Sequence, residues 1–192
     1  MKKVFYSSNP YLYERLLGEA TGEVKKISIF DFDGTLFASP EKPDWWPMHG
    51  FGSKLQTLSP PYVPEHPTGD WWSTGNVSAA RREIGRSDVH TVLLTGRLKT
   101  FESRIKDMLD SAGLEFDEYH FCPGGDTLKF KLSVIEDLLE KFPTVDFVEM
   151  WEDKPEHVGP FEEKLTQLGL PKFKVNLVEK EAKNFDVDEY VG

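Results

Sequence analysis

Residues 27–37, "ISIFDFDGTLF", decide the fold: an apolar run leads into two aspartates one residue apart, followed by a glycine. Side chains two residues apart on a strand point to the same side, so Asp31 and Asp33 can converge at the end of a strand expected over residues 27–32. Ligands bind at the carboxyl edge of open parallel sheets. A Mg²⁺ ion, which prefers oxygen ligands, would allow two carboxylates to lie close together. The alternative is an ordinary strand followed by an acidic turn, because Asp and Gly are common turn residues.

Further apolar runs alternate with helical patterns, which is typical of an α/β fold built from βαβ units around a parallel sheet. The other strands are expected over residues 89–94, 116–121, 145–151 and 173–178. Two helices are expected to begin after Asn76 and Thr100, which would act as N-terminal caps. A third is expected over residues 130–139 and would end before Pro143, and a fourth would start near Pro155. Pro160 is expected to interrupt or delay the last helix.

Residues 38–75 do not fit this alternation, since they hold seven prolines, both Trp-Trp pairs and little periodicity. A long loop inside a compact domain is typical of a functional lid or binding loop. Two uses are open for its four tryptophans, which are Trp45, Trp46, Trp71 and Trp72. Their rings could stack on nucleic-acid bases, or they could anchor the loop on the domain.

Composition narrows the class of protein. The chain has 192 residues and a formal charge of −10, so we expect one domain over residues 1–192 and no general nucleic-acid-coating surface. The sequence shows neither an apolar run long enough to span a bilayer nor a secretory signal, which favours a cytoplasmic or otherwise intracellular protein without a membrane partner. Cys122 is the only cysteine, and we expect it to be a small buried thiol.

Polar groups also follow two other expected strands. Thr95 and Gly96 come directly after the strand over 89–94, where a hydroxyl and free backbone N–H groups can hold a phosphate oxygen. Arg97 could form a bidentate pair with a substrate phosphate, or it could form a structural salt bridge within the protein. Glu152 and Asp153 end another strand and look like metal ligands.

Together these segments resemble the four motifs of the haloacid dehalogenase (HAD) superfamily of phosphatases and phosphotransferases. The motifs are "DFDGTLF" at 31–37, "LLTGR" at 93–97, "FK" at 130–131 and "WED" at 151–153. With the Trp-rich insertion, "LEFD" at 114–117 and "WEDKPEH" at 151–157, the chain is most similar to the HAD domain of Swiss Army Knife RNA repair proteins, over residues 26–180. The resemblance implies a Rossmannoid three-layer sandwich with a central five-stranded parallel sheet, and a cap or flap formed by residues 38–75.

The resemblance also implies roles for the motif residues. Asp31 would be the nucleophile that forms an aspartyl-phosphate, and Asp33 the general acid and base, which would also offer its backbone carbonyl to Mg²⁺. Thr95 would hold a phosphoryl oxygen. Lys131 would steady the nucleophile and the phosphoryl charge, with Lys129 as the alternative lysine.

In the same way, Asp153 would bind Mg²⁺ directly, while Glu152 would reach it through water or orient Asp153. Gly96, Arg97 and the tryptophans of the insertion would contact substrate. The implied activity is Mg²⁺-dependent hydrolysis of a phosphomonoester, with RNA or nucleotide end phosphates favoured. The alternatives are a small-molecule phosphatase or nucleotidase, and a binding module that has lost turnover.

Overall fold

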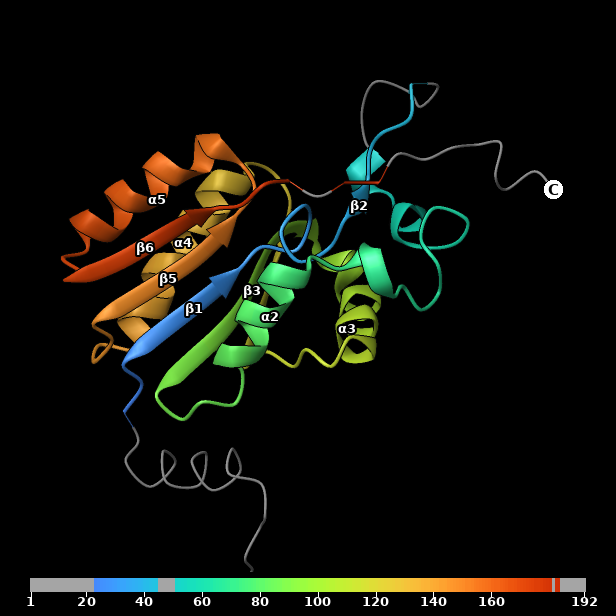
Figure 1. Cartoon of the computed structure of the whole chain (residues 1–192). Coiled ribbons are helices and arrows are strands. Elements are labelled where there is room, and N and C mark those ends of the chain that lie inside the picture. Colours follow the sequence, from blue (N-terminus) through green and yellow to red (C-terminus); the bar gives the residue numbers. More distant parts are fainter. Residues whose placement is uncertain (1–22, 45–50, 181, 184–192) are drawn as a thin grey trace, which may run out of the picture.

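The computed structural model describes residues 23–44, 51–180 and 182–183 (Figure 1). Its centre is a five-stranded sheet in the order β4-β3-β1-β5-β6, and every neighbouring pair is parallel. The strands are β1 (Lys26–Phe30), β3 (Val89–Leu98), β4 (Glu118–Cys122), β5 (Phe147–Glu152) and β6 (Lys172–Leu177). The expected α/β fold with a central five-stranded parallel sheet is confirmed.

Helices cover both faces of the sheet, which makes three layers. Helices α2 (Thr74–Glu83) and α3 (Glu102–Ser111) lie on one face, and α4 (Thr127–Lys141) and α5 (Pro155–Gln167) on the other (Figure 1). The central strand β1 serves both cores because its side chains alternate: Phe30 belongs to the cluster with α2 and α3, and Ile29 to the cluster with α4 and α5. This double burial explains why the strand reads as a continuous apolar run.

Three expectations about element ends are wrong. Ser73, not Asn76, precedes α2, and the Asn76 amide donates instead to the Thr35 carbonyl oxygen at 2.9 Å. Thr100 lies inside a 3-10 turn, η4 (Lys99–Phe101), ahead of α3. Helix α5 begins at Pro155 and continues through Pro160. A proline removes only one hydrogen bond from the ladder, and burial of the apolar side of α5 against the sheet holds the helix together.

Strand β3 is longer than expected. It runs on to Leu98, and its pairing with β4 shifts register between Thr95 and Leu98. An irregularity of this kind bends a strand and re-aims its side chains. The polar segment 95–97 therefore belongs to the strand's carboxyl end rather than to a loop that follows it.

The insertion after β1 packs on the α2 and α3 side of the sheet. Its described residues include three short 3-10 turns, η1 (Phe51–Ser53), η2 (Leu55–Leu58) and η3 (Gly69–Trp71). Its buried anchors are Phe51, Leu58, Val63 and Trp72. Arg104 of α3 donates hydrogen bonds to the backbone oxygens of Leu58, Pro64 and Glu65, which fixes the middle of the insertion. Trp45 and Trp46 lie outside the described residues.

A two-residue strand of the insertion, β2 (Ser39–Pro40), pairs in parallel with β7 (Ala182–Lys183) near the end of the chain. We call this pair the β2–β7 clasp. Figure 1 shows the two segments side by side at the carboxyl edge of the main sheet. Glu41 N–H donates to the Lys183 carbonyl oxygen at 2.8 Å and extends the clasp.

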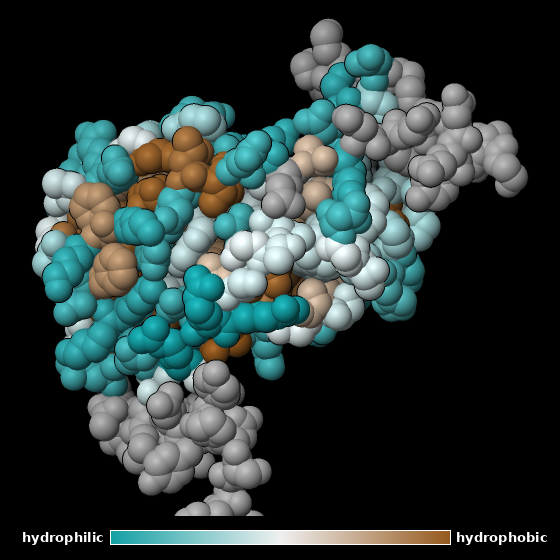
Figure 2. Space-filling model, viewed as in Figure 1, coloured by the Kyte–Doolittle hydropathy of each residue, from teal (hydrophilic) through white to brown (hydrophobic). Residues whose placement is uncertain are grey.

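The surface is largely hydrophilic on the face drawn in Figure 2, and its apolar residues form separate patches. Among the described residues, no helix has the length and apolar character needed to cross a membrane. Cys122 is buried, with 1% of its surface exposed, as expected.

Candidate active site

Asp31 lies directly after β1 and is held on both carboxylate oxygens. Its backbone N–H donates to the Trp151 carbonyl oxygen of β5, which continues the sheet ladder to the edge. Oδ1 accepts from the backbone N–H of Phe32 at 2.7 Å, and Oδ2 accepts from Lys131 Nζ at 2.7 Å. With 5% of its surface exposed, this carboxylate is fixed in one orientation.

Lys131 reaches Asp31 from the second turn of α4, and Lys129 does not. Lys131 is 1% exposed and also donates to Glu152 Oε2 at 2.7 Å. Burial alone would lower the pKa of Lys131, but the charges of Asp31 and Glu152 outweigh burial and raise it, so the ammonium form is kept. Lys129 is exposed, and its backbone N–H donates to the Asp126 side chain that caps the helix.

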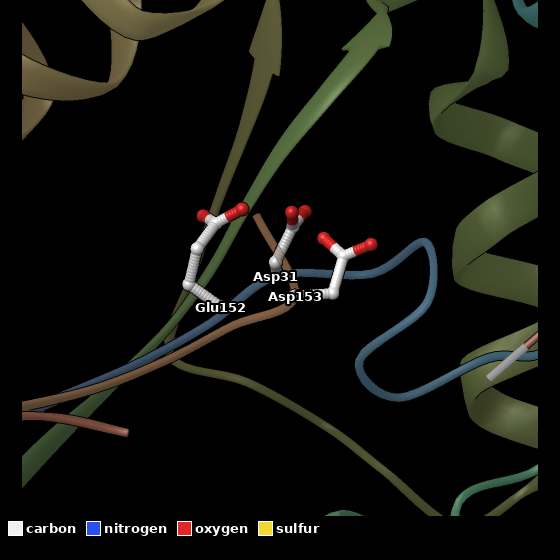
Figure 3. Close-up of side chains that lie close together, drawn as sticks. All are labelled: Asp31, Glu152 and Asp153. Carbon is white, nitrogen blue, oxygen red and sulfur yellow. The ribbon is translucent and has the colours of Figure 1, made fainter. Parts of the chain in front are cut away.

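Three carboxylates converge at the ends of β1 and β5, those of Asp31, Glu152 and Asp153 (Figure 3). One oxygen from each lies within 4.8 Å of the others. Burial, followed by the charge of Asp31, raises the pKa of Asp153 to about 6 and that of Glu152 to about 8. Asp153 Oδ1 is buried and has no hydrogen-bond partner among the described residues. Clustered oxygens with an unsatisfied lone pair fit a hard divalent cation such as Mg²⁺.

Glu152 has the most protein partners of the three carboxylates. Besides the contact with Lys131, its Oε1 lies 3.2 Å from Nδ1 of His157 and 3.4 Å from the backbone N of Lys154. Burial, and then the positive charges of Lys131 and Lys154, lower the pKa of His157, which keeps that ring neutral near pH 7. Asp153 is therefore freer than Glu152 to bind a cation.

Gly34 allows Asp153 to approach the loop after β1. Its φ of +70° lies in the left-handed region that favours glycine, and a Cβ added there would sit 2.4 Å from Asp153 Oδ2. The glycine of the opening motif thus serves both the turn and the packing of a candidate metal ligand.

The side chain of Asp33 pairs with Arg97. Arg97 Nη2 lies 2.6 Å from Asp33 Oδ1, Nε lies within 3.0 Å of both oxygens, and Ser39 Oγ also donates to Oδ1. Burial acts to raise the pKa of Asp33, but Arg97 and then Ser39 outweigh it, so the pKa lies below its usual range. The lowered pKa favours the carboxylate form of Asp33. Its side chain is not part of the cluster formed by Asp31, Glu152 and Asp153.

The guanidinium of Arg97 is occupied by protein groups. Its Nη1 donates to the Gly52 carbonyl oxygen at 2.9 Å and to Thr57 Oγ1 at 3.2 Å, and the side chain is 7% exposed. Arg97 therefore ties the insertion to Asp33. This geometry favours the structural salt bridge over a bidentate pair with a substrate phosphate.

Thr95 and Gly96 lie at the bend in β3. Thr95 is fully buried, and its Oγ1 accepts a hydrogen bond from the backbone N–H of Arg97 at 3.1 Å. Gly96 packs against Thr127 at the start of α4, where an added Cβ would come within 2.8 Å of Thr127 Cγ2. Gly96 also lines a cavity at the carboxyl edge of the sheet.

A cavity of about 650 Å³ opens over these residues at the carboxyl edge of the sheet. Its walls come from the loop after β1, the insertion, the end of β3, the starts of α4 and α5, and the segment before β7. Of the residues singled out from sequence, those that line it are Asp31, Asp33, Gly96, Arg97 and Asp153.

A comparison with family models now bears on this site. Residues 43–190 match the model described as HAD domain family 1 in Swiss Army Knife RNA repair proteins. This chain belongs to that family. The match includes Thr95, Lys131 and Asp153, whereas Asp31 and Asp33 precede it.

Other relatives of this HAD domain are distant. An uncharacterized protein of Saccharomyces cerevisiae is 23% identical over 184 residues, which cover 79% of this chain and 39% of that protein. The chain therefore spans about two-fifths of the curated relative's length.

Two solved structures share the fold of this HAD domain. One is the Pnkp1/Rnl/Hen1 RNA repair complex, with a TM-score of 0.52 and 16% identity over 80% of this chain and 43% of that one. The other is the HAD domain of effector protein Lem4 from Legionella pneumophila, with a TM-score of 0.52 and 17% identity over 88% of this chain and 93% of that one.

Neither described tryptophan of the insertion lines the cavity. Trp72 is 9% exposed, contacts the rings of Phe32 and Phe37, and donates from Nε1 to the Pro67 carbonyl oxygen at 2.8 Å. Trp71 stacks on the ring of Phe37, with centroids 5.5 Å apart. These contacts favour the anchoring alternative for both residues over contact with a substrate base.

Two cavity residues, Ser39 and Lys180, have no signal in the sequence of this HAD domain. Ser39 contacts Asp33 from the β2–β7 clasp, and Lys154 and Lys180 line the cavity at its rim. The sequence places Lys154 directly after Asp153, where solvent is favoured over substrate as its environment. Ser39 and Lys180 are brought to the site by pairing between segments 143 positions apart in sequence. Only the folded chain could identify them.

Proposed function

We propose that this HAD domain is a Mg²⁺-dependent phosphomonoester hydrolase that works through an aspartyl-phosphate on Asp31. The observation that carries the proposal is the arrangement at one cavity wall: Asp31 is held by Lys131 and lies beside the candidate metal ligand Asp153. A buried carboxylate with a fixed orientation and an adjacent ammonium is suited to attack phosphorus.

In the first step an oxygen of Asp31 attacks phosphorus while the bond from phosphorus to the ester oxygen breaks. Asp33 gives a proton to the departing oxygen, so it must be protonated at that moment. The pair with Arg97 opposes this protonation and favours the carboxylate. We infer that substrate entry weakens the pair between Arg97 and Asp33.

In the second step water attacks the phosphorus of the aspartyl-phosphate. Asp33 accepts the proton from this water, the bond from phosphorus to Asp31 breaks, and inorganic phosphate leaves. The pair with Arg97 lowers the pKa of Asp33 and so favours the carboxylate form that this step needs. Thr95 and the backbone N–H of Gly96 are the groups available to hold a phosphoryl oxygen on the β3 side.

The residues fit a Mg²⁺ ion. Asp31 and Asp153 would bind it directly, together with the backbone carbonyl of Asp33, while Glu152 would orient Asp153 or act through water. A bound Mg²⁺ would offset the repulsion between the carboxylates and the charge of the phosphoryl oxygens.

RNA or nucleotide ends are the substrate class that we favour. The support is the family, which is described from RNA repair proteins, and a structural neighbour that is part of an RNA repair complex. A small-molecule phosphatase or nucleotidase would use the same residues and remains the competing activity.

The test is phosphate release with Mg²⁺ from a panel of RNA and DNA 3′- and 5′-phosphates, nucleotides, phosphopeptides and sugar phosphates. Asp31→Asn should abolish release, while Asp146→Asn, which alters an exposed aspartate before β5, should retain it. Trapping the phosphorylated chain with a radiolabelled substrate and mapping the label to Asp31 would test the intermediate. Release by wild type no greater than by Asp31→Asn on every substrate would refute the proposed activity.

A further inference from the structure

Most cations near the active site are already paired within the protein. Lys131 is shared by Asp31 and Glu152, and the guanidinium of Arg97 is divided between Asp33 and the insertion. Among the described residues, the remaining cations of the cavity wall are Lys154 and Lys180. This distribution matters because a phosphorylated substrate brings negative charge into a chain whose formal charge is already −10.

Lys154 lines the cavity next to Asp153. It follows this candidate metal ligand directly and precedes Pro155, the first residue of α5. Within the described part of the chain its ammonium forms no ion pair, although its charge is felt at Asp33 and Asp153. Its charge is thus available to an anion in the cavity.

Lys180 lines the same cavity from the C-terminal segment. Its side chain passes over the loop after β1, so that its Cγ lies 3.0 Å from where a Cβ on Gly34 would be. The ammonium lies 3.3 Å from Glu41 Oε1, and both side chains are more than half exposed, at 57% and 51%. An exposed pair of this kind is weak, so an anion can replace Glu41.

The β2–β7 clasp fixes the place of Lys180. Pairing of Ser39–Pro40 with Ala182–Lys183, together with an ion pair between Lys183 and Asp70, ties this segment to the insertion. Lys154 and Lys180 therefore line the cavity beside Asp153 and Gly34, whereas Gly96, which follows the candidate phosphoryl-holding Thr95, lines it from β3.

We propose that Lys154 and Lys180 form a subsite for a second phosphate, carried by the leaving alcohol of the substrate. The inference rests on the proposed function, which places the reacting phosphate at Asp31. The preferred ligand is an ester whose alcohol bears another phosphate group a few bonds away, as in a nucleoside 3′,5′-bisphosphate. A plain monoester would leave both lysines without a substrate partner.

The test measures binding rather than turnover. An Asp33→Asn protein keeps all three clustered carboxylates and is titrated with Mg²⁺ and either a nucleoside 3′-monophosphate or the matching 3′,5′-bisphosphate. We expect the bisphosphate to bind at least about fivefold more tightly, and the preference to shrink as salt rises because the lysines are exposed. Lys154→Gln and Lys180→Gln should each bring the ratio of the two Kd values toward one, and Lys154→Arg should keep it.

Lys129→Gln is the matched control, because it removes an exposed lysine near the start of α4 that does not line the cavity. Equal binding of the two ligands by the parent protein would overturn the proposal. So would lysine variants that weaken both ligands equally, since the lysines would then act on the reacting phosphate. Thermal unfolding of each variant separates loss of the subsite from loss of the fold.

The same titration separates this inference from the proposed activity. If wild type hydrolyses the monophosphate while both ligands bind equally, the subsite is wrong and the activity stands. If wild type releases no phosphate from any substrate, the activity is wrong and the binding ratio still decides the subsite. A hexose bisphosphate and a short RNA with a 3′-phosphate serve as further ligands, and their ranking identifies the source of the second phosphate.

Discussion

At the scale of single residues, Arg97 illustrates how one side chain can link two parts of a site. It pairs with Asp33 and donates to the insertion through Gly52 and Thr57. Truncation would leave the Asp33 carboxylate partly buried without its partner. The effect depends on the charge of Asp33 and therefore on pH.

We predict that Arg97→Gln lowers the free energy of unfolding by about 1–3 kcal/mol at pH 7, less than for a fully buried pair, because 32% of the Asp33 side chain is exposed. The lowered pKa of Asp33 means that this stabilisation is present above the unfolded pKa near 3.8 and is lost as pH falls through the folded value. Urea unfolding at several pH values checks this, with Arg82→Gln on exposed α2 surface as the control. A difference that does not shrink in acid would contradict it.

We also predict that Gly34→Ala weakens Mg²⁺ binding by about tenfold or more, because an added Cβ would displace the Asp153 carboxylate. Strain at a positive φ adds about 1–2 kcal/mol of destabilisation. Gly113→Ala is a matched control, since Gly113 has a φ of +67° but open space where a Cβ would sit. Calorimetric titration with Mg²⁺ should show normal affinity for Gly113→Ala, and similar losses in both variants would mean that contact with Asp153 is irrelevant.

At the scale of elements, the insertion is held by packing rather than by regular secondary structure. Its turns are short, and Trp72 joins them to Phe32 and Phe37 in the core below. An aromatic anchor of this kind compensates for the few backbone hydrogen bonds in a proline-rich segment.

We predict that Trp72→Ala lowers the free energy of unfolding by about 3–5 kcal/mol, as is typical of truncating a buried tryptophan. Trp71→Ala should cost clearly less, because Trp71 is only partly buried. Guanidinium unfolding monitored by circular dichroism compares the two variants. Equal losses would show that Trp72 is not the main anchor.

At the scale of the whole molecule, metal binding should be linked to stability and pH. Without a cation, the raised pKa values of Asp153 and Glu152 mean that the folded chain holds their protons more tightly than the unfolded chain does. The contribution of these two groups to stability therefore falls as pH rises from about 4 to about 8.

We predict that Mg²⁺ raises Tm, and that the rise is larger at pH 8 than at pH 5.5, since the cation competes with protons for the same oxygens. Thermal scans with and without Mg²⁺ at both pH values measure the effect. The double variant Asp31→Asn with Asp153→Asn should show no rise. A rise that is independent of pH would argue against these carboxylates as the ligands.

By itself, the sequence determined those features of the fold and of the candidate site that depend on local pattern. Apolar runs and helical periodicity located the five strands and the order of the elements, and parallel topology brought the strand ends to one edge. Asp31 and Asp153 could be predicted to meet there because each follows a strand end, whereas Lys129 and Lys131 stayed alternatives. Helix boundaries differ from the local pattern at Asn76 and Pro160 because packing on the sheet outweighs local propensity.

Only the tertiary structure decided which groups pair. Lys129 and Lys131 lie two positions apart on a helix, so they point in very different directions, and the start of α4 at Thr127 selects Lys131. The partners of Arg97, and the approach of Lys180 to the cavity, depend on contacts between segments far apart in sequence. Such contacts follow from how the insertion and the β2–β7 clasp pack in space, and no local pattern encodes them.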